Sequence, residues 1–496
     1  MTVKVQFVNL PQSPISCRNL IGGEWMSGSG SEIKVHSPYT GHQIGVTTDS
    51  NAQDVTRAVR AAQSAFPAWK QTPIKERCRL LFEFRQQVMN NIEELSHLVA
   101  AESGKTVAEG KAGILKGLEV TEFALSLQNM DSGGIMNVSR GVSCEVRHEP
   151  IGVVVGIVPF NFPAMVPMWM FPIALACGNC FVLKPSEKVP LTMTRMAELI
   201  QKAGFPAGVF SIVQGRQQTV EALIDAPEVK AVAFVGSSPV ALSLYKRATA
   251  LGKRALCLGG AKNPIILAPD ADPAVAIDGI LKSFTGCAGQ RCMAASVLLA
   301  VGNVENVING VIEQAKKLVL GSDMGAIIDR AAMTRIENAL NAAEKAGAKI
   351  VLDGRKAAKP AGCEGGFWIG PTIIDHANAD MACAKDEIFG PVITVIRVKT
   401  LPDAMRVDAV NSYGNATSVF TTSGAVADYV TTNTTAGMIG VNIGVPVPRE
   451  PFSFGGTKDS KYGHGDITGE SAVEFWTDRR KVTRKWELQR DSNWMS

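Results

Sequence analysis

One cysteine of this chain has surroundings that could support covalent chemistry. Cys292 lies in the segment 284–294, among glycines and other small residues, with Arg291 directly before it. The aliphatic run 296–300 follows, so we expect a loop that leads into a strand. A thiol on such a loop, close to a cation and to backbone N–H groups, has its thiolate favoured and can attack a carbonyl carbon. A buried structural cysteine is the alternative interpretation of the same residue.

Other sequence features argue against several further kinds of site. The segment 103–106 imitates the end of a phosphate-binding loop, but the glycine required five residues earlier is Val99. Cys177 and Cys180 have redox spacing inside an apolar run, where two packing cysteines are the better reading. The six histidines form no i,i+4 pair and no G-x-S-x-G is present, so we expect neither a metal site nor a serine hydrolase.

Length and charge restrict the class of protein further. A chain of 496 residues predicts two to four domains, and a net charge of +4 without a long basic run argues against nucleic acid as a partner. The 33 residues 151–183 carry no charge, but four prolines interrupt them, so we expect a buried strand, a loop and a buried helix rather than a membrane span. Ten scattered cysteines and no signal-peptide pattern predict a cytoplasmic, reducing location.

The elements that must position Cys292 follow from hydrophobic periodicity. Residues 54–101 have helical spacing, and then strands and helices alternate. A first βα series has strands at 153–158, 180–184, 209–213 and 232–235, with helices near 163–177, 192–203, 217–225 and 240–250. A second has strands near 264–267, 296–300, 348–352 and 392–398, with helices near 274–283, 304–319, 330–346 and 401–411. The pattern predicts an α/β protein with a doubly wound parallel sheet, which binds nucleotides at the carboxyl ends of its strands.

Eight motifs in a fixed order resemble the aldehyde dehydrogenase superfamily. They are ESGKT (102–106), IVPFNFP (157–163), VLKPSE (182–187), FVGS (234–237), LGG (258–260), GQRC (289–292), KDEIFGP (385–391) and FGG (454–456). The resemblance implies an aldehyde dehydrogenase-like fold with a Rossmann-type NAD-binding domain at 1–129 and 151–258. It also implies an α/β catalytic domain at 259–455 and oligomerisation arms at 130–150 and 472–496, and hence a homo-oligomer, a tetramer or a dimer.

The resemblance also implies a role for each matching residue. Cys292 would attack the aldehyde, while the Asn161 amide and the Cys292 backbone N–H would bind the oxyanion. The cofactor NAD would contact Phe160, Lys184, Glu187, Gly236, Ser237, Glu387 and Phe389. A carboxylate at 187 repels a 2′-phosphate, which favours NAD over NADP.

One departure from the superfamily pattern indicates the branch. Hydrolytic members read Glu-Leu-Gly-Gly and use that glutamate to activate water, whereas this chain has Cys257 at the position. A thiol is a poor base for water, so coenzyme A would take the acyl group instead. The segments 160–172, 260–263, 291–294 and 442–448 resemble the CoA-acylating methylmalonate-semialdehyde dehydrogenase branch. That branch oxidises malonate or methylmalonate semialdehyde, loses CO₂ and gives acetyl-CoA or propionyl-CoA, and Arg291 and Lys116 would bind the substrate carboxylate.

Two other functions stay open. The first is a hydrolytic NAD(P)-dependent aldehyde dehydrogenase that releases a free acid, with Asp478 or Glu387 as the substitute water activator. The second is a non-catalytic dinucleotide-binding protein on the same fold.

Overall fold

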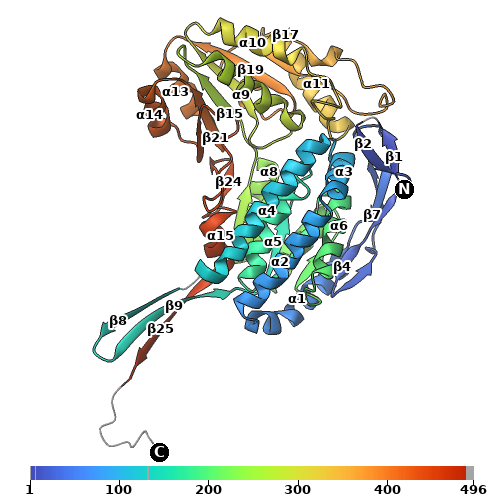
Figure 1. The fold of residues 1–496 in the computed structure, drawn as a ribbon, viewed down its shortest axis with the longest axis vertical. Helices are drawn as coiled ribbons and strands as arrows, with labels where there is room; N and C mark the ends of the chain where they lie inside the picture. Colours follow the sequence, from blue (N-terminus) through green and yellow to red (C-terminus); the bar gives the residue numbers. More distant parts are fainter. Residues whose placement is uncertain (1, 6, 131–132, 487–496) are drawn as a thin grey trace, which may run out of the picture.

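The computed structural model describes residues 2–5, 7–130 and 133–486, and two large sheets dominate it (Figure 1). The first sheet has eight strands. Their order is β24 (Lys461–Tyr462), β14 (Arg254–Leu258), β13 (Val229–Val235), β10 (Val153–Ile157), β11 (Cys180–Lys184), β12 (Phe210–Ile212), β4 (Asn19–Ile21) and β5 (Glu24–Met26). The five strands from β14 to β12 are parallel, and antiparallel strands flank them. The strand order reverses direction between β10 and β13, which makes that position the topological switch point of a doubly wound sheet.

The helices of the first sheet are amphipathic or fully buried connections. They are α1 (Ala52–Gln71), α2 (Ile74–Asn90), α3 (Ile92–Ser103), α4 (Val107–Met130), α5 (Met165–Ala176), α6 (Pro190–Lys202), α7 (Gln217–Asp225) and α8 (Ser238–Ala250). Every residue of β10, α5 and β11 is buried. The uncharged stretch 151–183 therefore forms the centre of this core, as predicted, because parallel strands covered on both faces are apolar throughout. None of the helices in the described residues combines the length and apolar character that crossing a membrane requires.

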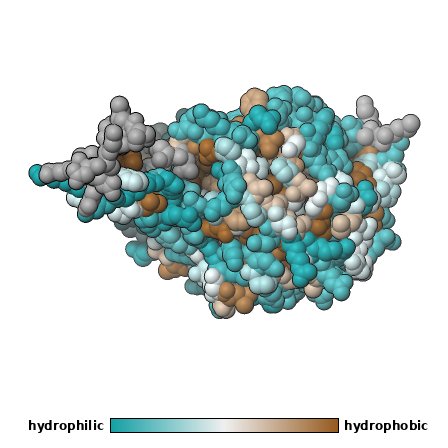
Figure 2. Space-filling view, turned by 90° about the horizontal axis from the view of Figure 1, so that it is seen from below, coloured by the Kyte–Doolittle hydropathy of each residue, from teal (hydrophilic) through white to brown (hydrophobic). Residues whose placement is uncertain are grey.

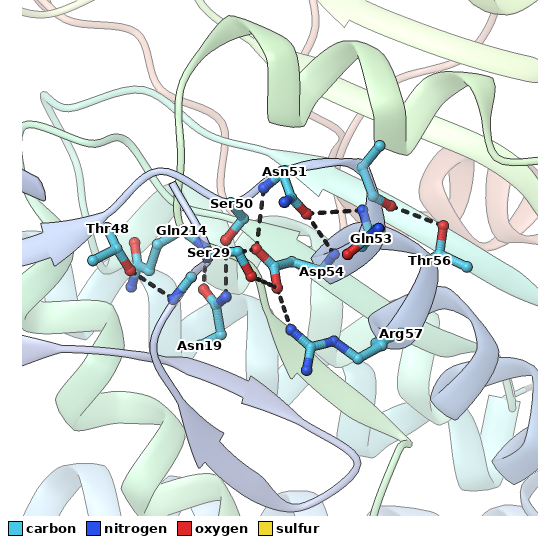
Figure 3. Close-up of polar contacts among 12 residues, drawn as sticks. Asn19, Ser29, Thr48, Ser50, Asn51, Gln53, Asp54, Thr56, Arg57 and Gln214 are labelled. Atoms are coloured by element: carbon cyan, nitrogen blue, oxygen red, sulfur yellow. Dashed lines mark hydrogen bonds and ion pairs between the residues drawn. The ribbon is translucent and has the colours of Figure 1, made fainter. Parts of the chain in front are cut away.

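A polar cluster joins the N-terminal strands to this sheet (Figure 3). The Asn51 side chain caps α1, and Asp54 accepts hydrogen bonds from the backbone N–H groups of Ser29 and Asn51. The side chain of Asn19, in β4, donates to Ser50 at 2.8 Å and accepts from the Gln214 N–H at 2.7 Å. Since Asn19, Ser50 and Gln214 are buried, their mutual hydrogen bonds hold β4 against the end of β12.

The second sheet has seven strands and lies above the first in Figure 1. Their order is β17 (Lys349–Leu352), β18 (Thr372–Ala377), β19 (Val392–Val398), β16 (Ala295–Val301), β15 (Asn263–Leu267), β21 (Ala416–Phe420) and β22 (Met438–Val441). All pairs are parallel except β17 with β18. Its helices are α9 (Pro273–Thr285), α10 (Glu305–Ala315), α11 (Arg330–Lys345), α12 (Ala382–Lys385), α13 (Leu401–Val410) and α14 (Gly424–Asn433).

The smaller strands lie at the edges of the body. Near the N-terminus they are β1 (Thr2–Val5), β2 (Val8–Pro11), β3 (Ile15–Cys17), β6 (Glu32–His36) and β7 (Gln43–Thr48), and further on β20 (Tyr413–Gly414) pairs with β23 (Thr457–Lys458). Val8, Leu10 and Val35 share one core with Ile266 of β15, in the second sheet, and with Leu340 of α11. The N-terminal residues thus pack against both sheets, and the predicted domain limits stay a prediction.

An arm of three strands extends from the body (Figures 1 and 2). β9 (Val142–Pro150) lies between β8 (Gly134–Ser139) and β25 (Thr477–Lys485), with Thr477 opposite Pro150 and Lys485 opposite Val142. β8 is exposed throughout and presents Ile135 and Met136, which are 72% and 67% exposed. Of the predicted C-terminal arm, residues 472–476 belong to helix α15 (Gly469–Trp476), which buries one face, and 487–496 lie outside the described residues.

Candidate active site

A pocket of about 770 Å³ opens beside the switch point of the first sheet and reaches the second sheet. It is lined by nine of the residues predicted for the site: Phe160, Asn161, Lys184, Glu187, Gly236, Ser237, Cys292, Glu387 and Phe389. These residues come from loops more than 200 positions apart in the sequence, so the fold alone brings them together. Arg291 and Lys116 are not among the lining residues.

The end of the pocket near β11 contains a pair of opposite charges, Lys184 and Glu187. We call it the adenosine end, because the family resemblance predicts that this pair binds the adenosine ribose. The Lys184 Nζ lies 3.1 Å from Glu187 Oε2. Burial alone would raise the pKa of the Glu187 carboxyl, but the Lys184 charge, the Glu187 backbone N–H and Lys188 outweigh it, and the pKa is lowered. Gly236 and Ser237 line the same pocket directly before α8, and the first backbone N–H groups of a helix suit a phosphate. A carboxylate for ribose hydroxyls next to a helix N-terminus fits a dinucleotide such as NAD.

The middle of the pocket is formed by Glu387 and two aromatic rings. Glu387 Oε1 accepts the Ala261 N–H at 2.9 Å, and burial raises the pKa of this carboxyl despite that bond. A Cβ at Gly260 would lie 2.5 Å from Glu387 Oε2, so only glycine lets the carboxylate approach. Phe160 and Phe389 meet edge to face with their centroids 5.9 Å apart. The Glu387 carboxylate therefore faces the pocket between apolar walls.

The loop that carries the thiol, residues 286–294, has an unusual backbone; we call it the thiol loop. Cys287 and Ala288 have φ values of 55° and 51°, and Gly289 follows at 67°. A left-handed conformation is unfavourable by about 1–2 kcal/mol for each of the first two residues. The Glu109 side chain in α4 stabilises it by accepting the Cys287 N–H at 2.5 Å. A Cβ at Gly289 would lie 2.0 Å from the Gly390 carbonyl oxygen, so the loop packs directly on the backbone next to Phe389.

Two asparagines orient the backbone of Cys292. Its carbonyl oxygen accepts hydrogen bonds from Asn263 Nδ2 at 2.8 Å and from Asn415 Nδ2 at 2.9 Å. Asn263 Oδ1 in turn accepts the Ala416 N–H at 3.0 Å, which links the thiol loop to the strands β15 and β21. Neither role was predicted from the sequence. Asn263 lies in a quoted motif without an assigned function, and Asn415 carries no sequence signal at all.

The thiol itself differs from the prediction that its thiolate is favoured. The pKa of Cys292 is raised to about 12, because burial and, less strongly, the Glu387 carboxylate raise it by more than Arg291, a backbone N–H and Lys105 lower it. The prediction was wrong because it counted the neighbouring cation and omitted desolvation, which depends on the tertiary structure. The resting thiol is therefore protonated at neutral pH, and chemistry requires a base or a stabilising charge.

Asn161 lies in the pocket wall and is buried. Its Nδ2 donates to the Gln290 carbonyl oxygen at 3.0 Å, which occupies one of the two N–H donors of the amide. The Gln290 side chain accepts the Ile328 N–H at 3.0 Å and donates to the Ala326 oxygen at 3.2 Å. The amide of Asn161 is thus held next to the thiol loop, and binding of an oxyanion by it stays a prediction.

The two cations predicted to bind a substrate carboxylate have other partners here. Arg291 donates from its Nη2 to the carbonyl oxygens of Lys282 and Ser283, at 2.6 and 2.7 Å, in the last turn of α9. Lys116 lies in α4, where its Nζ is 3.0 Å from Glu119 and 2.9 Å from the Pro448 oxygen. Their role at a substrate stays a prediction.

Three cations that line the pocket were not predicted from the sequence: Lys188, Arg216 and Arg335. Arg335, in α11, lines the pocket and donates to the Ile388 oxygen at 3.4 Å. Its helical position carried no motif, so no sequence signal marked it.

Cys257, at the position of the missing base, and the two predicted substitutes, Asp478 and Glu387, lie in different parts of the fold. Cys257 lies in β14, completely buried, and burial raises the pKa of its thiol to about 12. Asp478 lies in the arm and pairs with Arg254 at 2.7 Å, so it does not reach the pocket. Glu387 is the one of the three that lines it. Within the described residues, no three His, Cys, Asp or Glu side chains gather as metal ligands.

Comparison with known proteins agrees with this geometry. The aldehyde dehydrogenase family matches residues 25–482. Malonate-semialdehyde dehydrogenase 1 of Geobacillus thermodenitrificans is 42% identical over 478 residues, which cover 95% of this chain and 98% of that protein. A crystal structure of methylmalonate-semialdehyde dehydrogenase from Oceanimonas doudoroffii has a TM-score of 0.94 at 40% identity, covering 95% and 99% of the two chains. A Sinorhizobium meliloti structure described as a methylmalonate-semialdehyde dehydrogenase complexed with NAD has a TM-score of 0.94 at 36% identity, covering 96% and 99%. The chain belongs to the aldehyde dehydrogenase family.

Proposed function

We propose that this enzyme oxidises a short carboxylated aldehyde, malonate or methylmalonate semialdehyde, with NAD, and transfers the acyl group to coenzyme A. The observation that carries the CoA step is the buried Cys257, which stands where hydrolytic members have their water-activating glutamate. The relatives named for malonate and methylmalonate semialdehyde support the substrate class. The Sinorhizobium structure with NAD, and the Lys184–Glu187 pair, support the cofactor.

The chain's own residues account for the oxidation. Cys292 loses its proton to a base, for which Glu387 in the pocket wall is a candidate, and its sulfur attacks the aldehyde carbon. The carbonyl oxygen becomes an oxyanion near the Asn161 amide and the Cys292 N–H. NAD, when bound, supplies the nicotinamide ring that accepts a hydride. As the hydride leaves the tetrahedral carbon, the C=O bond forms again and a thioester remains on Cys292.

The second half of the reaction releases the acyl group. A carboxylate β to the thioester carbonyl leaves as CO₂, because the thioester oxygen accepts the electrons as an enolate, which is then protonated. The thiolate of CoA attacks the thioester, and Cys292 leaves as a thiolate. The product is acetyl-CoA from malonate semialdehyde and propionyl-CoA from methylmalonate semialdehyde.

We further propose a homo-oligomer, a tetramer or a dimer, assembled through the arm. β8 presents an exposed edge and the apolar side chains of Ile135 and Met136, which is typical of a surface covered by another subunit. Light scattering of the whole chain and of a chain that ends at residue 476 tests this. A monomer from the whole chain at micromolar concentration would contradict the proposal.

Product analysis tests the central proposal. NADH formation is measured with each semialdehyde, with and without CoA, and the product is identified as thioester or acid. We expect fast turnover only with CoA. Equal turnover without CoA, giving a free acid, would favour the hydrolytic alternative and point to Glu387 as its water activator.

A substitution at position 257 sharpens this test. Cys257→Glu restores the carboxylate of the hydrolytic members, so we expect acid release without CoA to rise about tenfold or more. Cys180→Glu in β11 of the same sheet serves as the control for placing a carboxylate in the same core, because Cys180 is equally buried. If both variants or neither released acid, the identity of residue 257 would not be what selects CoA.

A further inference from the structure

Lys105 is a buried cation with no hydrogen-bond acceptor among the residues that the structure describes. It lies between α3 and α4, in the segment 103–106 that imitates a phosphate-binding loop, and is 4% exposed. Across the described ranges, no acceptor lies within hydrogen-bonding distance of its Nζ. The Nζ sits 3.8 Å from the centre of the Phe162 ring, and Phe162 lines the pocket. A cation–π contact offsets part of the desolvation of an ammonium group, and an anion nearby would offset more.

The position of Lys105 relative to the thiol loop is fixed by hydrogen bonds. The Lys105 carbonyl oxygen accepts the Tyr39 hydroxyl at 2.7 Å. The Gly104 oxygen accepts the Ala326 N–H at 2.7 Å, and the Ala326 oxygen accepts Gln290 Nε2 at 3.2 Å. Because Gln290 is two residues before Cys292, the turn and the thiol loop are held as one unit.

The acidic residues on the two helices beside Lys105 are bonded to backbone groups. Glu102 in α3 accepts the N–H groups of Leu191 and Thr192 at 2.7 and 3.0 Å. Glu109 in α4 accepts the N–H groups of Thr106 and Cys287 at 3.0 and 2.5 Å. Neither forms an ion pair with Lys105 within the described part of the chain, so no carboxylate neutralises the Lys105 ammonium group by direct contact.

Three charged side chains act on the Cys292 thiol. Glu387 raises its pKa, while Arg291 and, to a smaller extent, Lys105 lower it. The guanidinium of Arg291 is bonded to two carbonyl oxygens at the C-terminal end of α9, where the helix dipole is negative. That end offsets part of the Arg291 charge, whereas Lys105 has no such acceptor.

We propose that Lys105 is a positioning residue whose charge stabilises the Cys292 thiolate through the low-dielectric interior before the aldehyde is attacked. The inference rests on Cys292 as the nucleophile of the proposed function. Well below the pKa of a thiol, its thiolate fraction rises tenfold per pH unit, and alkylation follows that fraction. Loss of a stabilising charge therefore lowers the alkylation rate by the same factor at every pH.

Alkylation of the whole protein by iodoacetamide, followed by mass spectrometry of the Cys292 peptide at pH 7, 8 and 9, measures this factor. We expect Lys105→Met to slow labelling of Cys292 by about three- to tenfold at each pH. Lys105→Arg, which keeps the charge, restores the rate to within about twofold. Cys144, a half-buried thiol in the arm, is the control within the same molecule, and its labelling should not change. Lys105→Gln provides a second neutral variant.

Three results would overturn the proposal. One is equal labelling of Cys292 in wild type and both neutral variants. Another is slower labelling of Cys292 in Lys105→Arg as well, or slower labelling of Cys144 in the neutral variants, because either result indicates altered access or folding. The third is unchanged labelling with a higher KM for malonate semialdehyde but not for propanal, which would make Lys105 a substrate ligand. Labelling needs neither aldehyde nor CoA, so a failed product assay leaves this result interpretable.

Discussion

At the adenosine end of the pocket opposite charges meet, whereas near Cys292 they do not. Lys184 and Glu187 are 3.1 Å apart, and the pKa of the carboxyl is lowered. Near the thiol, the Nζ atom of Lys105 has no hydrogen-bond acceptor among the described residues, and burial raises the pKa values of Glu387 and Cys292. Paired groups form a fixed binding surface that changes little with conditions. Unpaired charged groups can instead stabilise the charge that develops on the reacting atoms as a bond forms.

The largest effect is expected when the reacting sulfur atom of Cys292 is replaced. Cys292→Ser should lower NADH formation by about 10⁴-fold or more, because a serine hydroxyl is far less ionised than a thiol. NAD affinity, measured by fluorescence titration, should stay within about twofold since the adenosine end is unaltered. Cys144→Ser serves as the control, and turnover in Cys292→Ser above about a hundredth of wild type would contradict the assignment.

The second-largest effect is expected from a change of pH, which should alter the reactivity of Cys292 but not the binding of NAD at the adenosine end. With burial raising the pKa of Cys292 to about 12, its thiolate fraction and alkylation rate should rise about 100-fold from pH 7 to pH 9. The pKa of Glu187 is lowered, so this carboxylate is ionised throughout the interval and NAD affinity should be constant. A labelling rate that levels off below pH 8 would show a thiol already ionised near neutrality.

Removing one of the two amides that bind the Cys292 carbonyl should have a moderate effect. In Asn415→Ala only Asn263 is left to orient this peptide. We expect kcat to fall about tenfold, with NAD affinity unchanged. Asn433→Ala, which removes an exposed amide on α14, is the matched control. Equal kcat in the two variants would mean that one asparagine suffices.

The smallest effect is expected when the charge pair at the adenosine end is broken. Glu187→Gln leaves Lys184 buried without its carboxylate, so KM for NAD should rise about fivefold while kcat stays within twofold. The discrimination against NADP should also weaken, since a repelling charge is lost. Glu198→Gln breaks an exposed pair with Arg195 and should leave both constants as they are. A kcat effect in Glu187→Gln would show that the two ends are coupled.

The sequence predicts this molecule well where a pattern repeats or a motif is complete. The limits of α7 (217–225) and β19 (392–398) agree with the hydrophobic periodicity. The motif residues Lys184 and Cys292 both reach the pocket. Strand β18 and helix α4 were missed, because their mixed polar and apolar residues give no clear period.

What the sequence could not predict depends on groups that are distant along the chain. The pKa of Cys292 follows from burial, which no local window reports. The role of Asn415 follows from a contact with residue 292, and a single asparagine has no periodic signal. Arg291 precedes the thiol directly, yet its side chain turns back to the carbonyl oxygens of α9.

The pairing of β25 with β9 has a consequence for synthesis. Cys144 and Thr483 face each other in the arm although 339 residues separate them. At a translation rate of about 5–20 residues per second, β9 leaves the ribosome roughly 20–70 s before its partner strand exists. During that time one edge of β9 has unpaired backbone groups, which invite pairing with other nascent chains. Interrupted translation before residue 477 would leave this edge open permanently, so assembly through a finished arm selects completely translated subunits.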